Sequence, residues 1–218
     1  MLHSRAKHAA EAGVDAFLVG SSYLAHDRFD ATVQALKSLQ GPPVLIFPGN
    51  ARQVSSHADG LLLLSLASGR NAQWLIGEHV IAAPILAASR VELIPTGYLL
   101  IESGRITSVQ AMSQTIPLPS DKPDLTLAHA LAAEQLGMRA IYLEAGSGAA
   151  QPVPVATVAA CAHALTSVLI VGGGIRTPDH ARERSQAGAD WLVVGTAWER
   201  MNDASWLREM VAATHGIE

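Results

Sequence analysis

The sequence has little charge and a single cysteine, and both features limit what the protein can be. Charged residues make up 16% of the 218 residues, with a formal net charge of −4 and no run of Lys and Arg. Because nucleic-acid binding depends on a strongly positive surface, we expect no nucleic-acid partner. Cys161 is the only cysteine and cannot form a disulfide within the chain, so we expect a cytoplasmic protein.

Long hydrophobic runs are also absent. The longest apolar stretches, such as 60–67 and 80–88, fall well short of the roughly 20 residues that a membrane-spanning helix needs. The N-terminus lacks the apolar core of a secretory signal and leads into a helical pattern that ends at Ala12 and Gly13. Hydrophobic residues reach 49%, enough for a large core, so we expect residues 1–218 to form one domain.

Short apolar runs alternate with segments of helical spacing, which is typical of βα units around a parallel sheet. Strands are predicted at Asp15–Val19, Val44–Phe47, Leu61–Ser65, Val91–Ile94, Ala140–Leu143, Val168–Val171 and Trp191–Val194. Helices are predicted at Phe29–Leu39, Asn71–Ile81, Asp124–Leu136, Pro178–Ala187 and Ala204–Thr214. Small or polar residues follow nearly every strand, which favours a closed α/β (β/α)8 TIM barrel over an open doubly wound sheet.

Two segments do not fit a regular barrel. Residues 50–59 are too few and too polar for a normal barrel helix, so the third helix is predicted to be irregular. Residues 98–106 resemble a β-hairpin with a turn at Ser103 and Gly104. We therefore expect a modified barrel.

Two glycine-containing turns follow consecutive predicted strands near the C-terminus. The first contains Gly172, Gly173 and Gly174 ahead of a helix start at Thr177 and Pro178, and the second contains Gly195 and Thr196. Glycines let backbone N–H groups approach an anion, and loops after the last two strands of such barrels form the recurrent phosphate site. The alternative is that the glycines only allow tight turns. The pair of turns favours phosphate binding.

A carboxylate and a phenol stand close together at the end of another predicted strand. Tyr142 and Glu144 are two residues apart, so both side chains face the same side of the strand. Glu144 is placed to accept a substrate hydroxyl or take its proton, and the alternative is a solvated charge at the rim. Tyr142 and Glu144 are the predicted catalytic residues.

The motifs resemble those of the geranylgeranylglyceryl phosphate synthases and their heptaprenylglyceryl phosphate synthase relatives. The resemblance rests on YLEAGSG at 142–148, VGGGIR at 171–176, VGT at 194–196, VGSS at 19–22, SLASGRNAQWLIGEH at 65–79 and IPTGYLLIESG at 94–104. It covers nearly the whole chain in order, and YLEAGSG with IPTGY is specific. It also implies an irregular third helix and a hairpin after the fifth barrel strand.

The resemblance implies a transferase of ether-phospholipid biosynthesis, dependent on Mg²⁺, that joins the 3-hydroxyl of sn-glycerol 1-phosphate to a polyprenyl diphosphate, with geranylgeranyl diphosphate as the expected donor. Ser22 would be a metal ligand. Glycerol phosphate would be held by Tyr142, Leu143, Glu144, Ala145, Gly146, Ser147, Gly148, Gly172, Gly173, Gly174, Gly195 and Thr196. Thr196 stands where many relatives have Asn. An apolar trough for the prenyl tail has Trp74, Leu75, Tyr98 and Leu99 as candidates, each of which could instead be ordinary packing.

One departure leaves the activity of the chain open. Relatives begin with a strand that carries an Asp-Pro-Asp-Lys-type run, and this sequence starts after it, about 25 to 30 residues short by comparison with the roughly 250 of an ordinary barrel. A barrel without one strand exposes two sheet edges. Either the true start lies upstream, which we favour, or the chain is a degenerate, non-catalytic phosphate-binding barrel. A related enzyme with another acceptor, such as 3-phosphoglycerate, is a further alternative. We expect a homo-oligomer that works beside the membrane.

Overall fold

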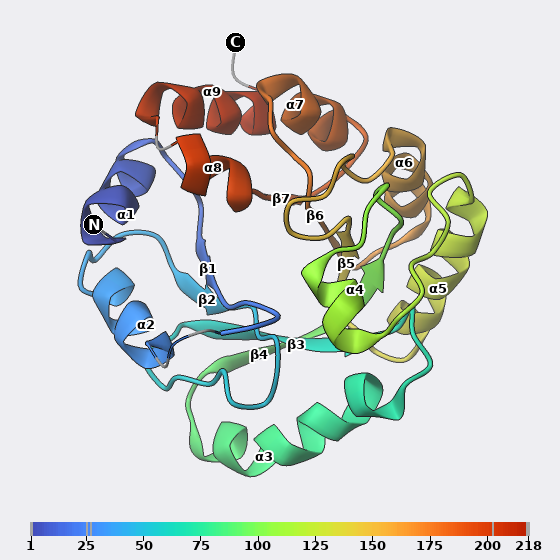
Figure 1. Ribbon diagram of the computed structural model, residues 1–218, viewed down its shortest axis with the longest axis horizontal. Helices are drawn as coiled ribbons and strands as arrows, with labels where there is room; N and C mark the ends of the chain where they lie inside the picture. Colours follow the sequence, from blue (N-terminus) through green and yellow to red (C-terminus); the bar gives the residue numbers. More distant parts are fainter. Residues whose placement is uncertain (1, 25, 27, 202, 217–218) are drawn as a thin grey trace.

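A computed structural model describes residues 2–24, 26, 28–201 and 203–216, and its seven strands form one parallel sheet (Figure 1). The strands are β1 (Phe17–Val19), β2 (Val44–Ile46), β3 (Gly60–Leu66), β4 (Glu92–Leu100), β5 (Ala140–Glu144), β6 (Val168–Gly172) and β7 (Trp191–Val193). Their order in the sheet is their order along the chain. Successive parallel neighbours require crossover connections, and helices supply most of them.

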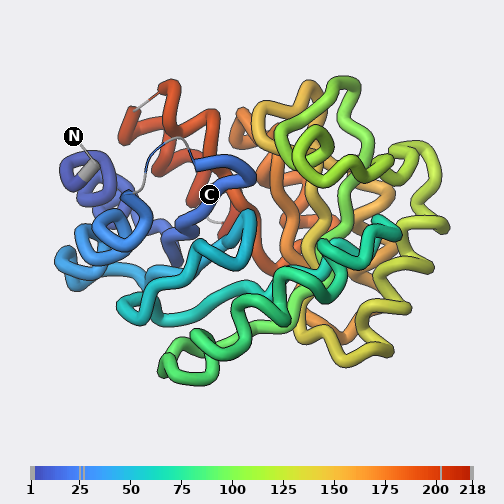
Figure 2. The backbone as a smooth tube through the Cα atoms, turned by 60° about the horizontal axis from the view of Figure 1, so that its bottom comes forward, coloured from blue at the N-terminus to red at the C-terminus, as the bar shows by residue number. Residues whose placement is uncertain are grey.

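The helices surround the curled sheet as an outer layer (Figures 1 and 2). They are α1 (Leu2–Glu11), α2 (Phe29–Lys37), the π-helix η1 (Gln73–Gly77), α3 (Glu78–Ala88), α4 (Ser108–Ser113), α5 (Pro123–Gln135), α6 (Val155–Ala164), α7 (Pro178–Gln186), α8 (Thr196–Met201) and α9 (Ala204–His215). The segment 50–59 contains no helix. The predictions of a modified (β/α) barrel and of an irregular third connection are therefore confirmed.

The sheet curls without closing on itself. Within the described residues, β1 pairs only with β2 and β7 pairs only with β6. The helical layer nevertheless continues past these two edges, because Ala9 of α1 and Ala12, just after this helix, share a hydrophobic cluster with Trp206 and Met210 of α9. Residues of β1 and β7 line a cavity of about 1710 Å³ that continues into the barrel.

Alternation along the strands separates two cores. Leu99, Leu143 and Val171 belong to the cluster between the sheet and the outer helices. Their neighbours Tyr98 and Tyr142 belong to the cluster inside the barrel. Successive side chains of a strand point to opposite faces of the sheet, so this register is what directs the predicted catalytic residues into the barrel.

The predicted hairpin at 98–106 is wrong. β4 continues through Gly97 to Leu100, a single parallel bridge joins Ile101 to Leu118, and α4 follows. Gly97 lies within this strand, and a Cβ at its position would be 2.7 Å from Cβ of Ala133 in α5. The glycine therefore lets α5 pack closely on the sheet.

The helix predicted at 71–81 has different limits. It begins as the π-helix η1 and continues as α3 to Ala88, with Pro84 inside it. Proline removes one backbone donor from a helix, and α3 nevertheless continues past Pro84, with Ala82 and Leu86 as its buried residues. None of the described helices combines the length and the apolar character needed to cross a bilayer.

Candidate active site

Glu144 lies at the C-terminal end of β5, inside the barrel. All five residues of β5 are buried, and Glu144 is 5% exposed. The chain turns sharply after the strand, where Gly146 has φ +98° and donates its N–H to Oε1 of Glu144 at 2.5 Å. The turn therefore gives the buried carboxylate a hydrogen-bond partner from its own loop.

The environment of Glu144 favours the protonated, uncharged form of its carboxyl group. Burial raises the pKa of Glu144 to about 7, against the opposing effects of the Gly146 N–H and of the phenols of Tyr142 and Tyr98. A carboxyl group with this pKa is partly ionised at neutral pH, which suits a group that takes up and releases a proton. The site thus holds a candidate general base.

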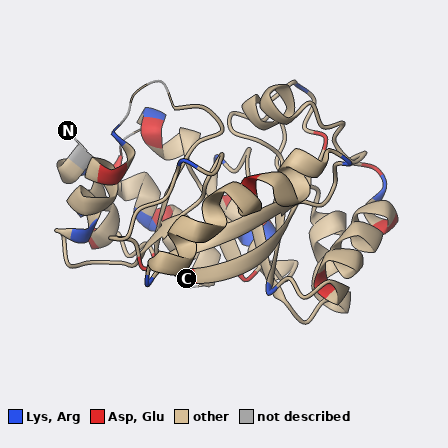
Figure 3. Ribbon diagram, turned by 90° about the horizontal axis from the view of Figure 1, so that it is seen from below, with Lys and Arg blue, Asp and Glu red and all other residues tan. Residues whose placement is uncertain are grey.

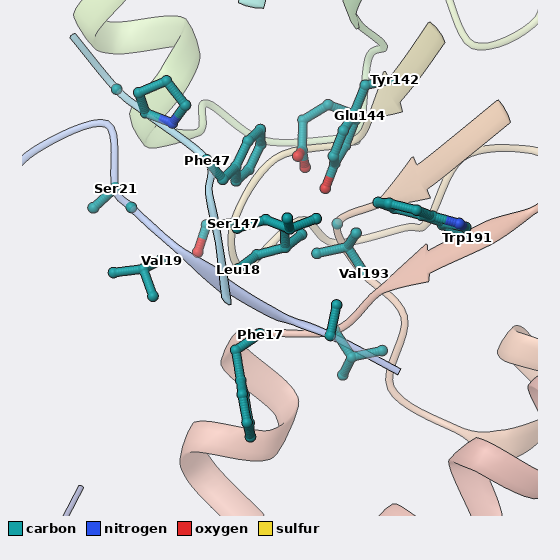
Figure 4. Close-up of a pocket in the computed structure, with 18 of the residues that line it drawn as sticks. Phe17, Leu18, Val19, Ser21, Phe47, Tyr142, Glu144, Ser147, Trp191 and Val193 are labelled. Carbon is teal, nitrogen blue, oxygen red and sulfur yellow. The ribbon is translucent and has the colours of Figure 1, made fainter. Parts of the chain in front are cut away.

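Aromatic rings lie close to this carboxylate, and Figure 4 shows those of Phe47 and Tyr142 beside Glu144. Phe47 stacks on Tyr142 with ring centroids 4.9 Å apart and planes 8° apart, and Tyr98 lies 5.4 Å from Tyr142. Burial, followed by the charge of Glu144, raises the pKa of both tyrosines well above the ordinary range. Both phenols therefore stay protonated and can donate hydrogen bonds. Phe47 was not among the predicted site residues, and its one signal in the sequence is its position at the end of a predicted strand.

The glycines after β6 allow a close approach between loops. A Cβ at Gly172 would lie 2.2 Å from the hydroxyl of Tyr142, and one at Gly173 would lie 2.5 Å from Oε1 of Glu144. Gly173 and Gly174 have φ +82° and +71°. Their N–H groups donate no hydrogen bond within the described part of the chain. This loop can therefore accept an anion beside the carboxylate.

The loops after β5 and β7 meet across the same opening. The hydroxyl of Ser147 lies 3.0 Å from that of Thr196. Of the predicted site residues, those that line the cavity are Ser22, Tyr142, Glu144, Ser147, Gly148, Gly173, Gly174, Gly195 and Thr196. Leu143 and Ala145 belong to the cluster on the helix side of the sheet. Gly146 donates a hydrogen bond to Glu144, and Gly172 leaves room for the hydroxyl of Tyr142.

Ser22 lies on the β1 side of the cavity, and no cluster of acidic side chains surrounds it among the described residues. It is half-buried and lines the cavity with Ser21 and Asn50. No three His, Cys, Asp or Glu side chains gather as a metal site in the described ranges. Resident Mg²⁺ in proteins usually takes one or two carboxylates, so these residues alone do not fit a resident magnesium ion.

The predicted trough residues divide into two groups. Trp74 and Tyr98 line the cavity, together with Leu63 and Leu64 of β3. Leu99 is fully buried on the opposite face of the sheet, and Leu75 does not line the cavity. The apolar wall is thus built from β3, β4 and η1.

Two other residues have simple structural roles. Arg176 donates hydrogen bonds to the carbonyl oxygens of Ala149 and Ala150, so it ties the loop after β6 to the loop after β5. Cys161 is buried in α6, and burial raises the pKa of its thiol to about 11. A thiol of this kind is a poor nucleophile.

Comparison with known proteins gives consistent matches. A geranylgeranylglyceryl phosphate synthase of Spirosoma linguale is 47% identical over 197 residues, which are 90% of this chain and 79% of the relative. One of Korarchaeum cryptofilum is 42% identical over 209 residues, 95% of this chain and 86% of the relative. The crystal structure of (S)-3-O-geranylgeranylglyceryl phosphate synthase from Thermoplasma acidophilum, in complex with sn-glycerol-1-phosphate, superposes with a TM-score of 0.92 at 35% identity. This match covers 98% of the present chain and 86% of the Thermoplasma acidophilum chain.

The match to a family model extends over almost the same residues. The model described as PcrB family matches residues 2–214. This range includes β1 to β7 and every loop that lines the cavity. The chain belongs to the PcrB family.

Proposed function

We propose that the chain is a prenyltransferase that joins the 3-hydroxyl of sn-glycerol 1-phosphate to a polyprenyl diphosphate, with geranylgeranyl diphosphate as the expected donor. The observation that carries this proposal is the buried carboxyl group of Glu144, with a pKa of about 7, beside the N–H groups of Gly173 and Gly174, which donate to no described residue. The names of the relatives and the ligand of the Thermoplasma acidophilum enzyme support these substrates.

The phosphate of the acceptor fits the loops after β5, β6 and β7. The N–H groups of Gly173 and Gly174 would bind its oxygens, and the hydroxyls of Ser147 and Thr196, 3.0 Å apart, would donate from the opposite side. Hydrogen bonds of N–H and O–H groups to a phosphate oxygen are strengthened by its charge. The glycerol moiety would then extend toward Glu144.

In the reaction, Glu144 takes the proton of the acceptor hydroxyl while the hydroxyl oxygen bonds to C1 of the prenyl chain. The bond between C1 and the diphosphate oxygen breaks, and the diphosphate leaves with the bonding electrons. The protonated phenols of Tyr142 and Tyr98 hold the carboxylate in place. The apolar wall around Trp74 would receive the prenyl tail.

Magnesium belongs to the proposal as part of the donor substrate. Ser22 offers a hydroxyl on the β1 side of the cavity but no carboxylate accompanies it in the described residues. We therefore propose that Mg²⁺ enters bound to the diphosphate oxygens and meets the chain at Ser22. Coordination by substrate phosphates is common for this ion.

A homo-oligomer is proposed from the outer face of η1 and α3. Ile76, Val80, Ile81 and Ile85 are 57–65% exposed there. The polar residues of α3 face the protein, since Glu78 accepts a hydrogen bond from the Ala51 N–H and His79 bonds to a carbonyl oxygen of β3. Figure 3, seen from the side of α3, shows a helix almost without charge. An apolar outer face of this kind favours contact with a second copy.

The proposed compartment is the cytoplasm, where the single cysteine would stay reduced. The reaction is tested by incubating the protein with labelled sn-glycerol 1-phosphate, geranylgeranyl diphosphate and Mg²⁺. A labelled ether lipid is the expected product. Replacement of the acceptor by 3-phosphoglycerate should give none, and a larger yield with 3-phosphoglycerate would contradict the proposed acceptor.

Binding without transfer is the second candidate, and the open side between β1 and β7 favours it. Water that enters through this side could reach the reacting carbon. Calorimetry with sn-glycerol 1-phosphate separates the two candidates when it is combined with the transfer assay. Heat of binding without any ether product would support the non-catalytic alternative.

A further inference from the structure

Gln53 is a fully buried amide in the irregular segment that replaces a barrel helix. Its side chain is 0% exposed, although the segment 50–59 is otherwise rich in polar and exposed residues. Burial of an amide costs free energy unless its donors and acceptor are paired. The position of Gln53 therefore calls for a specific partner.

All the hydrogen bonds of this side chain go to the backbone of two loops at the cavity. Oε1 of Gln53 accepts from the N–H of Ser21 at 3.1 Å and from the N–H of Gly49 at 3.1 Å. Nε2 donates to the carbonyl oxygen of Ser21 at 2.7 Å. The amide thus bonds to both backbone groups of Ser21, as a neighbouring peptide unit would.

The side chain of Gln53 continues the pairing of β1 and β2 beyond the end of their backbone hydrogen bonds. The last such bond runs from the N–H of Phe47, after β2, to the carbonyl oxygen of Val19 in β1. Beyond it the loops cross closely, since a Cβ at Gly20 would lie 1.7 Å from the carbonyl oxygen of Phe47 and one at Gly49 would lie 2.0 Å from that of Ser21. Gln53 holds this crossing together.

The crossing of the loops after β1 and β2 forms one rim of the cavity, and the glycine loop after β6 lies on the other rim. Gly20, Ser21, Ser22, Gly49, Asn50 and Gln53 all line the cavity, whose other rim contains Ser147, Gly173, Gly174 and Thr196. The unpaired N–H groups that suit the acceptor phosphate lie on the second rim. In the proposed reaction the donor also brings a polar end, its diphosphate, for which the first rim offers the hydroxyls of Ser21 and Ser22 and the amide of Asn50.

We propose that Gln53 is a positioning residue for the diphosphate end of the donor. It fixes the backbone at Ser21 and thereby the hydroxyl of Ser22, without touching the substrate. This inference rests on the proposed prenyltransferase function. It predicts that loss of the Gln53 amide weakens the binding of the donor and spares the binding of the acceptor.

The experiment compares Gln53→Met, which keeps the side-chain length but makes none of these hydrogen bonds, with Val158→Ala. Val158 is fully buried in α6, so its truncation destabilises the fold without touching the crossing. We expect Gln53→Met to weaken binding of magnesium diphosphate, measured by calorimetry, by about tenfold or more. The KM for geranylgeranyl diphosphate should rise in parallel. Affinity for sn-glycerol 1-phosphate should stay within about twofold, and Val158→Ala should change neither affinity.

Hydrogen exchange supplies a readout that does not depend on activity. The amides of Ser21 and Gly49 should exchange faster in Gln53→Met, whereas those of β5 and β6 should keep their protection. If Gln53→Met does not fold, Gln53→Glu replaces it, because a carboxylate keeps the two accepted bonds and loses only the bond donated to Ser21. That variant should also weaken the binding of magnesium diphosphate and leave the affinity for sn-glycerol 1-phosphate within about twofold.

Several outcomes overturn the inference. If Gln53→Met weakened the binding of magnesium diphosphate and of sn-glycerol 1-phosphate equally, Gln53 would have only a structural role. If it changed neither affinity, Gln53 would have no role in positioning the donor. Wild-type protein that binds no magnesium diphosphate would also overturn it. The proposed function fails separately, if the wild type binds diphosphate but neither binds sn-glycerol 1-phosphate nor forms the ether.

Discussion

Gly173 lies so close to the carboxylate of Glu144 that position 173 has no room for a side chain. A Cβ at Gly173 would lie 2.5 Å from Oε1 of Glu144 and 2.6 Å from the backbone nitrogen of Gly146. The φ of +82° at Gly173 adds backbone strain to any substitution. The glycine therefore determines where the carboxylate can lie.

Gly173→Ala should move Glu144 and abolish most of the activity. Gly137→Ala is the matched control, because Gly137 has φ +93° but no atom lies within 4 Å of its added Cβ. Both variants pay about 1 kcal/mol or more for the left-handed backbone. Turnover corrected for folded fraction should fall only in Gly173→Ala, and an equal fall in both would assign the effect to strain alone.

Glu144→Gln should lower kcat by roughly 10²- to 10⁴-fold, because an amide cannot take the proton of the acceptor hydroxyl. The amide keeps the shape of the side chain, so circular dichroism should show a folded protein. Single-turnover kinetics is the measurement. A variant with near-normal kcat would show that another group removes the proton, and a variant that is unfolded and inactive to the same extent would leave Glu144 without a catalytic role.

The pKa of Glu144 also predicts how stability depends on pH. The folded-state pKa of about 7 lies above the ordinary value of 4.5, so the folded protein binds this proton more tightly than the unfolded chain. The contribution of Glu144 is fully present below about pH 4.5 and is lost as the pH rises through 7, by about 3 kcal/mol at most. Urea unfolding of wild type and Glu144→Gln should diverge over this interval. Parallel stability curves would contradict the raised pKa.

Removal of divalent metal should stop transfer but not acceptor binding. In the proposal, Mg²⁺ travels with the diphosphate, whereas glycerol phosphate is held by N–H and O–H groups around Gly173 and Ser147. Excess chelator should therefore abolish ether formation, and added Mg²⁺ should restore it. Calorimetry with sn-glycerol 1-phosphate should give the same affinity with and without chelator. Transfer that persists in chelator would disprove the magnesium requirement.

The outer face of α3 predicts a change in oligomeric state. Ile81→Glu places a charge in the middle of this apolar face, so a second copy could no longer cover it without burying the charge. Light scattering should show a smaller particle, with little change in the stability of the protomer. Leu136→Glu is the control, since Leu136 is 81% exposed at the end of α5. A wild-type protein that is monomeric throughout would contradict the proposed contact.

The sequence alone predicted the barrel class because its signals are local. Alternating apolar and helical segments identify βα units, and glycine-rich or polar strand ends identify the face that binds ligands. The two-residue spacing of Tyr142 and Glu144 places both side chains on the same face of their strand. These features depend only on backbone periodicity, so no knowledge of distant contacts was needed.

Other features depended on contacts between segments far apart in the chain. The strand predicted to end at Ile94 continues to Leu100, with Gly97 inside it where Ala133 of α5 leaves no room for a Cβ. The stack of Phe47 on Tyr142 joins the residue that follows β2 to a residue of β5. Gln53 was one polar residue in an irregular segment until the fold placed its amide against Ser21.

The raised pKa of Glu144 belongs to the second group. The sequence supplied a carboxylate at the end of a strand, and this position is compatible with an exposed rim charge or with a buried base. Only the packing of Phe47, Tyr98 and the glycine loop around it removed the carboxylate from water. Desolvation is a property of all the surrounding atoms together, which is why the sequence determined the residue and the tertiary structure decided its chemistry.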